Sequence, residues 1–402
     1  MITKENISEA KIFTAYISRN TNWIFVKLKL SNGLEGWGEV TLNKSEKIIN
    51  QLANKRLHML VGLSLNELTN KINKMFTYVD IPSAVLTSGI NSAFIDLIAK
   101  NKNITVAKEL GGVVNPEIDV YANFNRRTID RSVEGMKKSA KDVKKNGFTA
   151  FKIAPFDEVF PSQSKLDFYK SLLKGIERID AIKSILGKDS KLMIDCHWRF
   201  RSDVVDTLIK EISPFDIYWL ECPVIENIET IELIKSIRNK VKKKGIKLAG
   251  LETCLTKNDF EPFLKTGCYD VVMPDIKYVG GPLQMLELSN FIKGYDIEFS
   301  PHNPSGPICH AHSLQICAAL DIPAMLEHQF DETYLFNEIV FNKLPHIKNG
   351  KVKLSQNPGI GCRIDKDLDV FKAENQTNID NNNKNVFDYI ADLSSSVAFT
   401  KR

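Results

Sequence analysis

The chain has 402 residues, 43% of them hydrophobic and 26% charged, which are ordinary values for a globular protein of two or more structural units. Its 54 basic and 49 acidic residues leave a net charge of only +5, so neither a nucleic-acid partner nor a membrane surface is indicated. Seven cysteines without CxxC spacing, no signal-type N-terminal segment and no apolar run of about 18 residues make a cytoplasmic protein without disulfides the expectation.

Residues 1–118 predict a small α+β unit. Strand-like segments bounded by turn signals occur at residues 12–16, 23–30 and 36–39. Helix-like segments occur at residues 46–76 and 82–101. We expect this unit to cap the rest of the protein, with a loop near residues 19–23 that excludes water and contacts the substrate.

Residues 119–355 predict a (β/α) barrel, because eight short apolar runs alternate with longer helix-like stretches. The runs are Ile118–Ala122, Ala150–Ile153, Leu192–Asp195, Ile217–Glu221, Leu248–Glu252, Val271–Pro274, Ile297–Ser300 and Ala324–Glu327. Several helix-like stretches end at a glycine, as expected before a strand: Gly147, Gly245, Gly267 and Gly294. A doubly wound open sheet is the alternative, but it usually has fewer strands and a glycine-rich first turn, which the sequence lacks.

Residues 356–402 predict a C-terminal segment that returns to the first unit. The segment begins with Pro358–Gly359–Ile360–Gly361 and a short strand-like run. Its Asn/Asp-rich stretch, residues 375–386, is expected to be loosely held.

Acidic residues close three successive apolar runs, at Asp195, Glu221 and Glu252. Since the polar groups of a barrel lie at the C-terminal strand ends, and strands three to five are neighbours, these carboxylates should converge. Converging carboxylates raise one another's pKa, and a bound divalent cation removes that cost. An oxygen-only ligand set favours Mg²⁺ first and Mn²⁺ second. Any one acid alone could be a cap or an ion-pair partner, but three in succession favour a metal site.

The next two runs end in Asp275 and His302. On adjacent strands, Asp275 could accept a hydrogen bond from the His302 ring and favour the protonated imidazole that a catalytic base must form. His197 follows Asp195 by two residues, so strand alternation would place both on the inward face and make His197 a candidate general acid. A packed strand-end histidine is the alternative.

Lys152 and Glu327 complete the predicted site. Lys152 would neutralise a substrate carboxylate or an enolate oxygen; the alternative is a lysine whose stem packs on apolar surface while its ammonium reaches water. Glu327, on the eighth run, would form a hydrogen bond to the enolate from the far side. His310 and His312, in the helix after the seventh run, are interpreted as structural.

Together these motifs resemble the mandelate racemase branch of the enolase superfamily. The resemblance also includes Gly36–Trp37–Gly38–Glu39 and Ser88–Gly89–Ile90–Asn91–Ser92–Ala93, and it covers every strand end from the second to the eighth. It implies a barrel with an N-terminal capping domain and a His302–Asp275 dyad. It also implies metal ligands at Asp195, Glu221 and Glu252.

One departure from that family bears on mechanism. Many members have two lysines spaced as K-x-K on the second strand, but the second position here is Ala154, which argues against a two-base racemase. With a single Lys152 and the Asp195–Cys196–His197 motif, the chain is similar to acid-sugar dehydratases of the galactonate dehydratase type. In those enzymes the second histidine of the site protonates the departing hydroxyl.

The resemblance implies a lyase that uses Mg²⁺ to dehydrate an aldonic or aldaric acid to a 2-keto-3-deoxy acid. We expect a small sugar acid as the only partner besides other copies of the chain in a homo-oligomer. Two alternatives stay open: an epimerase or racemase on the same scaffold, and a non-catalytic homologue that binds metal or a sugar acid.

Overall fold

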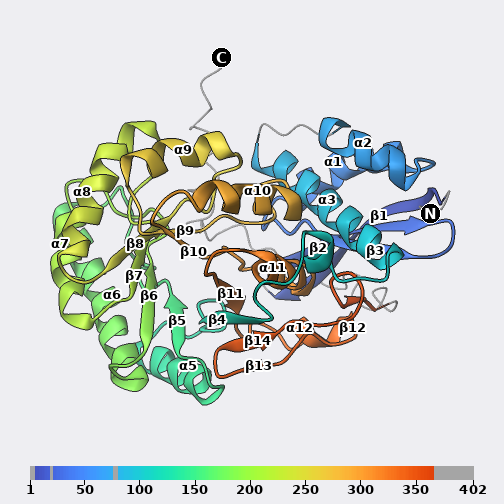
Figure 1. The fold of residues 1–402 in the computed structure, drawn as a ribbon. Helices are drawn as coiled ribbons and strands as arrows, with labels where there is room; N and C mark the ends of the chain where they lie inside the picture. Colours follow the sequence, from blue (N-terminus) through green and yellow to red (C-terminus); the bar gives the residue numbers. More distant parts are fainter. Residues whose placement is uncertain (1–4, 19–20, 76–79, 366–402) are drawn as a thin grey trace.

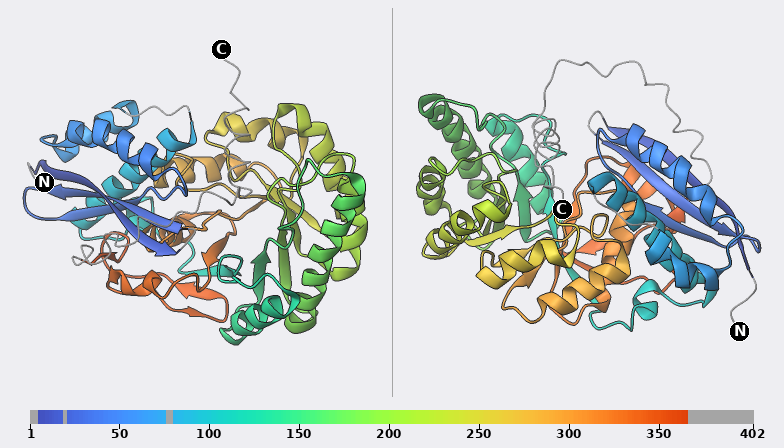
Figure 2. Two further views of the ribbon diagram at one scale, coloured as in Figure 1. Left: turned by 180° about the vertical axis from the view of Figure 1, so that it is seen from behind. Right: turned by 90° about the horizontal axis from the view of Figure 1, so that it is seen from above.

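The computed structural model describes residues 5–18, 21–75 and 80–365 (Figure 1). The start of the predicted water-excluding loop, Arg19 and Asn20, lies outside these residues, as does the Asn/Asp-rich stretch 375–386. The fold comprises an N-terminal α+β unit and a barrel, which lie side by side in all three ribbon views (Figures 1 and 2).

The N-terminal unit is built on a three-stranded antiparallel sheet in the order β1-β2-β3. The strands are β1 (Ile7–Ser18), β2 (Thr21–Leu30) and β3 (Glu35–Glu39). The predicted turn between the last two is present, with Gly33 at φ +91°. Left-handed φ values are readily adopted by glycine alone, so this residue permits the tight reversal.

Helices cover one face of this sheet. They are α1 (Glu46–Arg56), the 3-10 turn η1 (Leu57–Leu60), α2 (Leu65–Met75), α3 (Ile81–Asn101) and the short α4 (Val106–Glu109). The Asp80 side chain caps α3 by accepting from the Ser83 amide. Within the described ranges, α3 alone is long and apolar enough to cross a membrane, but 78% of its apolar window is buried, as in a core helix.

The glycine motifs of this unit serve packing. A Cβ added to Gly38 would lie 1.9 Å from the Gly89 carbonyl oxygen, and one added to Gly36 would lie 2.1 Å from the Ala93 carbonyl oxygen. The backbone of β3 therefore contacts the backbone of α3 directly, which no side chain would allow. The motifs that carried the family resemblance are thus explained by the contact between strand and helix.

Eight parallel strands close into the predicted barrel. They are β4 (Glu117–Asn123), β5 (Ala150–Ile153), β6 (Lys191–Asp195), β7 (Trp219–Glu221), β8 (Lys247–Gly250), β9 (Val271–Val272), β10 (Glu298–Phe299) and β11 (Met325–Gln329). Neighbouring strands pair in chain order, and β11 pairs with β4. A parallel bridge from Phe299 to Ala324 joins β10 to the start of β11. All eight predicted runs become strands, and closure excludes the open sheet.

Seven helices connect the eight strands and surround them (Figure 1). They are α5 (Val133–Lys145), α6 (Lys165–Leu186), α7 (Val205–Ile212), α8 (Ile231–Lys242), α9 (Lys257–Thr266), α10 (Pro282–Ile292) and α11 (Pro307–Ala319), with the 3-10 turns η2 (Ser213–Phe215) and η3 (Ile228–Thr230). Three of the predicted glycine stops, Gly147, Gly245 and Gly267, have positive φ.

The segment that follows the eighth strand differs from the segments that follow the other seven. As far as Asp365, the chain after β11 forms only the short helix α12 (Leu335–Glu338) and short strands. The strands are β12 (Val340–Phe341), β13 (Ile347–Lys348), β14 (Lys351–Lys353) and β15 (Arg363–Ile364). Strand β14 pairs antiparallel with β4. The sequence count of eight βα units therefore overstated the helices by one, because a hairpin takes the place of the eighth.

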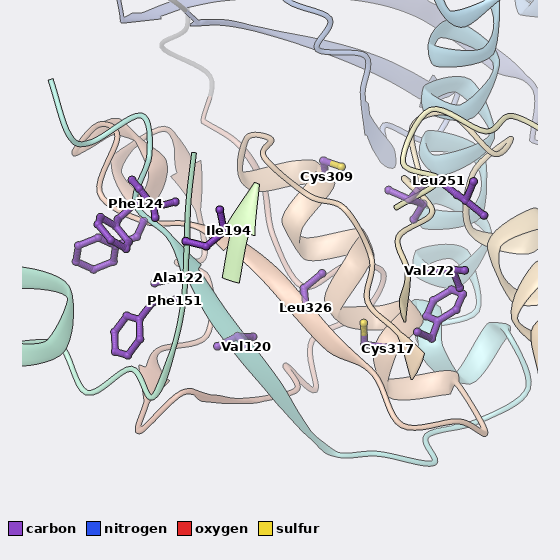
Figure 3. Packing of buried hydrophobic residues seen from close by; sticks show 14 of the residues in the cluster. Val120, Ala122, Phe124, Phe151, Ile194, Leu251, Val272, Cys309, Cys317 and Leu326 are labelled. Atoms are coloured by element: carbon purple, nitrogen blue, oxygen red, sulfur yellow. The ribbon is translucent and has the colours of Figure 1, made fainter. Parts of the chain in front are cut away.

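Strand alternation divides the barrel side chains into two sets. The outward set, which includes Val120, Ala122 and Leu326, packs with helix residues such as Cys309 and Cys317 (Figure 3). The inward set forms a separate apolar cluster that we call the barrel floor: Tyr121, Ala150, Met193, Trp219, Ala249, Val271 and Met273. The Tyr121 and Trp219 rings meet edge to face at 5.4 Å although their strands are not neighbours, so these side chains fill the interior.

Polar contacts join the two units beside the barrel. Asn91 Nδ2 on α3 donates to the Gly280 carbonyl at 2.8 Å, and the Gly280 amide donates to Ser88 Oγ at 2.9 Å. Further along, the Ile360 amide donates to Asp96 Oδ1 at 2.9 Å, so the described part of the C-terminal segment contacts α3. The domain boundaries near 118 and 355 stay predictions.

Candidate active site

The inward positions that follow the barrel floor are polar. Two residues beyond floor residues on four strands, toward the C-terminal ends, the inward set becomes Asn123, Lys152, Asp195 and Glu221. On β11, Glu327 likewise follows Met325, which packs against the floor. We call these five the polar layer. Because a strand presents alternate residues to one face, the step from floor to polar layer follows from sequence spacing. The interior therefore changes from apolar to charged at the end where the loops of a barrel build its site.

Lys152 is the centre of the polar layer. Its Nζ lies 2.7 Å from Glu221 Oε1 and 2.9 Å from Glu327 Oε1, and the side chain is only 1% exposed. Burial disfavours the ammonium, but Glu221 and Glu327 outweigh it and raise the pKa of Lys152 well above its usual value. The alternative of a lysine whose ammonium reaches water is therefore wrong.

Glu221 and Glu252 are carboxylates in an unfavourable environment. Burial raises the pKa of Glu221 to about 8, with Asp195 adding to the effect and Lys152 opposing it. Burial also raises the pKa of Glu252 well above its usual value, and the charges of Asp195 and Glu221 raise it further. The Glu252 Oε2 atom is buried and has no hydrogen-bond partner. Neighbouring carboxylates therefore raise the pKa of Glu221 and of Glu252.

Each of the three carboxylates faces a basic side chain in this structure. Asp195 Oδ2 lies 2.7 Å from His197 Nε2, Glu221 faces Lys152, and Glu252 Oε2 lies 3.6 Å from His302 Nε2. Among the residues that the structure describes, no three His, Cys, Asp or Glu side chains already surround a common point at metal-ligand spacing. The donor chemistry fits a hard divalent ion, since buried, mutually repelling carboxylates with an unpartnered oxygen gain most from one.

The structure brings His302 and Asp275 together as a pair. His302 Nδ1 lies 2.9 Å from Asp275 Oδ2, and Asp275 is fully buried. The other oxygen, Asp275 Oδ1, accepts from the Lys277 amide at 2.8 Å. A proton on His302 Nδ1 would be held by Asp275, which leaves Nε2 as the atom that can accept a proton from a substrate.

A tight turn, which the sequence did not predict, brings His197 to Asp195. Strand β6 ends at Asp195, and both His197 and Trp198 have left-handed backbone, at φ +47° and +55°. The argument from strand alternation is therefore wrong, because a tight turn replaces the strand at this point. The turn is closed by the His197 amide, which donates to Asp195 Oδ1 at 2.9 Å. Burial would raise the pKa of Asp195, but His197 outweighs it and lowers that pKa to about 2.

Glu327 is held by partners that sequence reasoning missed. Asn123 Nδ2 donates to Glu327 Oε1 at 2.7 Å, and the backbone N–H of Asn303 donates to Glu327 Oε2 at 2.8 Å. Burial opposes ionisation, but Lys152 and His302 lower the pKa of Glu327 below its usual value. Asn123 stands two residues after Tyr121 of the barrel floor, and this spacing could have identified it.

A buried lysine beside the dyad was also missed. Lys277 Nζ lies 3.5 Å from Asp275 Oδ2 and 3.4 Å from the Thr41 carbonyl oxygen of the N-terminal unit. Burial disfavours its charge, but Asp275 outweighs this effect and raises the pKa of Lys277. Lys277 follows Asp275 by two residues, and its amide donates to Asp275 Oδ1, so the chain turns back toward the carboxylate. This spacing could have identified Lys277 from the sequence.

His310 and His312 lie away from the polar layer. His312 Nε2 contacts the Trp37 carbonyl oxygen at 2.8 Å, and His310 Nδ1 contacts Asn303 Nδ2 at 3.0 Å. Burial lowers the pKa of both rings, so both are neutral packing residues, in keeping with their structural interpretation.

The N-terminal unit reaches the mouth of the barrel through the start of β2. The Thr21 hydroxyl donates to Glu332, in the loop after β11. Arg126, in the loop after β4, has Nη1 3.4 Å from Thr21 Oγ1 and 3.4 Å from Glu332 Oε2. Trp23 packs edge to face on Phe336 of α12, with ring centroids 5.9 Å apart. The described end of the predicted capping loop therefore contacts two barrel loops.

A closed parallel barrel with acidic and basic groups at its strand ends, beside an α+β unit, defines an enolase-type barrel enzyme. Comparison with known families agrees: residues 135–368 match the model described as enolase C-terminal domain-like. Residues 2–111 match the N-terminal domain of mandelate racemase / muconate lactonizing enzyme. The chain belongs to the mandelate racemase / muconate lactonizing enzyme family of the enolase superfamily.

Individual relatives are similar over nearly their whole length. A D-galactonate dehydratase from Ralstonia pickettii (strain 12J) is 24% identical over 365 residues, which are 88% of this chain and 91% of the relative. A solved structure described as a candidate dehydratase from Zymomonas mobilis ZM4 has a TM-score of 0.80 at 21% identity, covering 91% of this chain and 98% of that one.

A further solved structure, a candidate L-alanine-DL-glutamate epimerase from Burkholderia xenovorans strain LB400 bound to magnesium and fumarate, has a TM-score of 0.76. It is 20% identical and covers 90% of this chain and 95% of that one. These matches confirm the predicted superfamily, barrel and likeness to acid-sugar dehydratases.

Proposed function

We propose that this enzyme dehydrates a sugar acid, an aldonic or aldaric acid, to a 2-keto-3-deoxy acid with the help of Mg²⁺. The observation that carries the proposal is the placement of Asp195, Glu221 and Glu252 on three neighbouring strand ends, with the His302–Asp275 pair beside Glu252. The similarity to a galactonate dehydratase over most of both chains supports the substrate class.

Asp195, Glu221 and Glu252 would hold the metal, Mg²⁺ in the first place and Mn²⁺ in the second. When bound, the ion would supply a Lewis acid for the substrate carboxylate and for the negative charge that develops when the α-proton leaves. Glu221 faces Lys152 at present, so a ligand role for Glu221 would release the Lys152 ammonium to pair with the substrate carboxylate.

His302 would remove the proton α to the substrate carboxylate through Nε2. Asp275 orients the ring from the opposite side and stabilises the imidazolium that forms. Glu327, fixed by Asn123 and Asn303, would contact the enolate oxygen from across the barrel together with Lys152. Each of these groups is held by partners before substrate binds, which reduces the cost of ordering the site.

His197 would donate a proton to the departing 3-hydroxyl, which leaves as water. The enol then takes a proton at C3 and becomes the 2-keto-3-deoxy acid. His197 Nε2 faces Asp195 Oδ2 at present, so delivery of the proton from Nε2 requires the imidazole to leave Asp195. An epimerase on the same scaffold would instead return a proton to the α-carbon from the opposite face; Ala154 supplies no base there.

The substrate class is tested by screening for 2-keto acids with semicarbazide across a stereochemically complete set of pentonic, hexonic and aldaric acids, in the presence of Mg²⁺. We expect keto-acid formation from at least one sugar acid. Recovery of inverted substrate labelled with solvent deuterium at the α-carbon, without keto acid, would favour the epimerase. Neither product from any acid would favour the non-catalytic homologue.

We further propose a domain division of 1–118, 119–355 and 356–402, a homo-oligomeric assembly and a cytoplasmic location. The contact of Ile360 with Asp96 supports the first of these, because it joins the C-terminal segment to the first unit.

A further inference from the structure

Glu226, which lies outside the predicted site, has a carboxylate that accepts hydrogen bonds from four donors. It stands five residues after Glu221, in the loop that follows β7. Its Oε1 accepts from the Leu251 amide at 2.8 Å and from the Tyr269 hydroxyl at 2.5 Å. Its Oε2 accepts from Trp198 Nε1 at 2.9 Å and faces Cys222 Sγ at 3.8 Å.

Three of these donors flank the three carboxylates proposed as metal ligands. Trp198 follows Asp195 by three residues, Cys222 follows Glu221 directly, and Leu251 directly precedes Glu252. Their φ values are +55°, +43° and +71°, in the left-handed region that non-glycine residues adopt only when the surroundings hold them there. Glu226 therefore contacts one strained residue near each of the three carboxylates.

The fit of Glu226 against β8 is close. A Cβ added to Gly250 would lie 2.2 Å from Glu226 Oε1 and 2.7 Å from Tyr269 Cε1. Gly250 is the last residue of β8, two positions before Glu252. The absence of a side chain at that position gives the carboxylate direct access to the backbone that leads to Glu252.

Only a carboxylate satisfies these partners. The Leu251 N–H and the Trp198 Nε1–H can only donate, and they address different oxygens of Glu226. A glutamine at this position accepts at one of the two sites and places an NH₂ group against an N–H at the other. Glutamine matches glutamate in shape, so Glu226→Gln keeps the packing while it changes the hydrogen bonding and removes one negative charge, whereas Trp198→Phe changes the hydrogen bonding and keeps that charge.

We propose that Glu226 is a positioning residue which, by joining the segments beside Asp195, Glu221 and Glu252, fixes the relative placement of these carboxylates for a divalent ion. The inference rests on the proposed metal site. Groups that orient metal ligands typically contribute about 10- to 100-fold to metal affinity. A residue that merely stabilised the loops would affect the melting temperature and leave metal affinity unchanged.

The test is Mn²⁺ affinity, measured by titration calorimetry on the full chain after chelator treatment, together with the melting temperature of the metal-free protein. We expect Glu226→Gln to raise the Kd for Mn²⁺ by about 10- to 100-fold. Glu158→Gln is the matched control, since Glu158 also accepts two hydrogen bonds, both at 2.6 Å from Arg178, but contacts none of the three segments. Its Kd should equal that of the parent.

A Glu226→Gln protein that melts at a lower temperature but binds Mn²⁺ with the parent Kd would overturn the inference and leave the proposed function standing. A parent protein that binds no Mn²⁺ would overturn both. If Glu226→Gln fails to fold, Trp198→Phe decides, because it removes one donor and retains the carboxylate. A weaker Mn²⁺ affinity in Trp198→Phe supports the inference, and the parent Kd contradicts it.

Discussion

Lys152 shows how a single residue can prepare the site for two different partners. Its ammonium is buried between Glu221 and Glu327, where leaving either charge unpaired would cost several kcal/mol. A divalent ion that takes Glu221 as a ligand would keep that carboxylate compensated. Lys152 would then retain Glu327 and gain a substrate carboxylate. The lysine therefore balances the carboxylates in the structure and, in the proposed mechanism, would become available when metal binds.

We propose different tasks for the two histidines, the base for His302 and the acid for His197, and substitution should separate them. His302→Asn should stop both dehydration and exchange of the α-proton, because its Nε2 is the proposed base. His197→Asn should lower dehydration by about 10²–10⁴-fold while α-proton exchange with deuterated solvent survives, because His197 acts only on the leaving hydroxyl. Keto-acid assays and proton NMR in deuterated buffer measure the two steps. Dehydration at the parent rate in His197→Asn would contradict its assignment as the acid.

The sequence predicted the charged residues of the site better than their neutral partners. Asp275 and His302 could be paired from the sequence because each follows a strand by three residues, and adjacent strands place their ends together. Asn123 could not be assigned to Glu327 in the same way, since 204 residues separate them and an amide at a strand end has many possible uses. His197 was placed by an incorrect argument because a strand end can become a turn without any proline or glycine.

At the level of elements, glycine sets the distance between β3 and α3. Gly38→Ala would place a methyl group 1.9 Å from the Gly89 carbonyl oxygen, so the strand and the helix must separate. We expect the free energy of unfolding to fall by about 1–3 kcal/mol, as for other overpacked positions. Urea denaturation measures it. The control is Gly294→Ala, where the added Cβ would meet its nearest atom at 3.6 Å; an equal loss in both variants would contradict the packing argument.

The elements of the barrel were largely predictable, with one exception at its end. Each strand is a short apolar run, and Gly147, Gly245 and Gly267 mark the ends of their helices. The segment after β11 is different: Asn349 and Gly350 both have positive φ and form the turn between β13 and β14. This hairpin pairs with β4, and pairing over such a separation leaves no periodic signal in the sequence.

For the whole molecule, buried neutral histidines should make stability depend on pH. His310 is buried, and burial holds its pKa well below the usual value of about 6.5. Below pH 6.5 the unfolded chain therefore binds a proton that the folded protein does not. The contribution of His310 to stability is present above pH 6.5 and is lost as the pH falls, by up to about 1.4 kcal/mol per pH unit.

Urea denaturation between pH 7 and pH 5 checks this expectation. His310→Gln should reduce the dependence of the free energy of unfolding on pH, whereas His58→Gln, at an exposed position, should leave it unchanged. The two variants are compared by slope, so a constant loss of stability in either does not affect the result. If the free energy of unfolding of His310→Gln depends on pH as it does in the parent, the His310 ring binds protons alike in the folded and unfolded states. That result would contradict the expectation.

The interface between the two units was only partly visible in the sequence. Ser88 and Asn91 belong to a motif that marked the family, yet their contacts with Gly280, which follows Asp275 by five residues, appear only in three dimensions. The N-terminal unit thereby supports the loop that carries one member of the dyad. Thr21, Arg126 and Glu332 form a second junction between the two units, at the barrel mouth.

The central claim, that three strand-end carboxylates hold a divalent ion needed for dehydration of a sugar acid, is tested most directly by metal removal. Keto-acid formation from the best substrate of the screen is measured before chelation, after exhaustive EDTA treatment and after Mg²⁺ is restored. We predict loss of activity on chelation, full recovery with Mg²⁺ in the parent, and little recovery in Glu221→Gln. Undiminished activity after complete removal of metal would contradict the account.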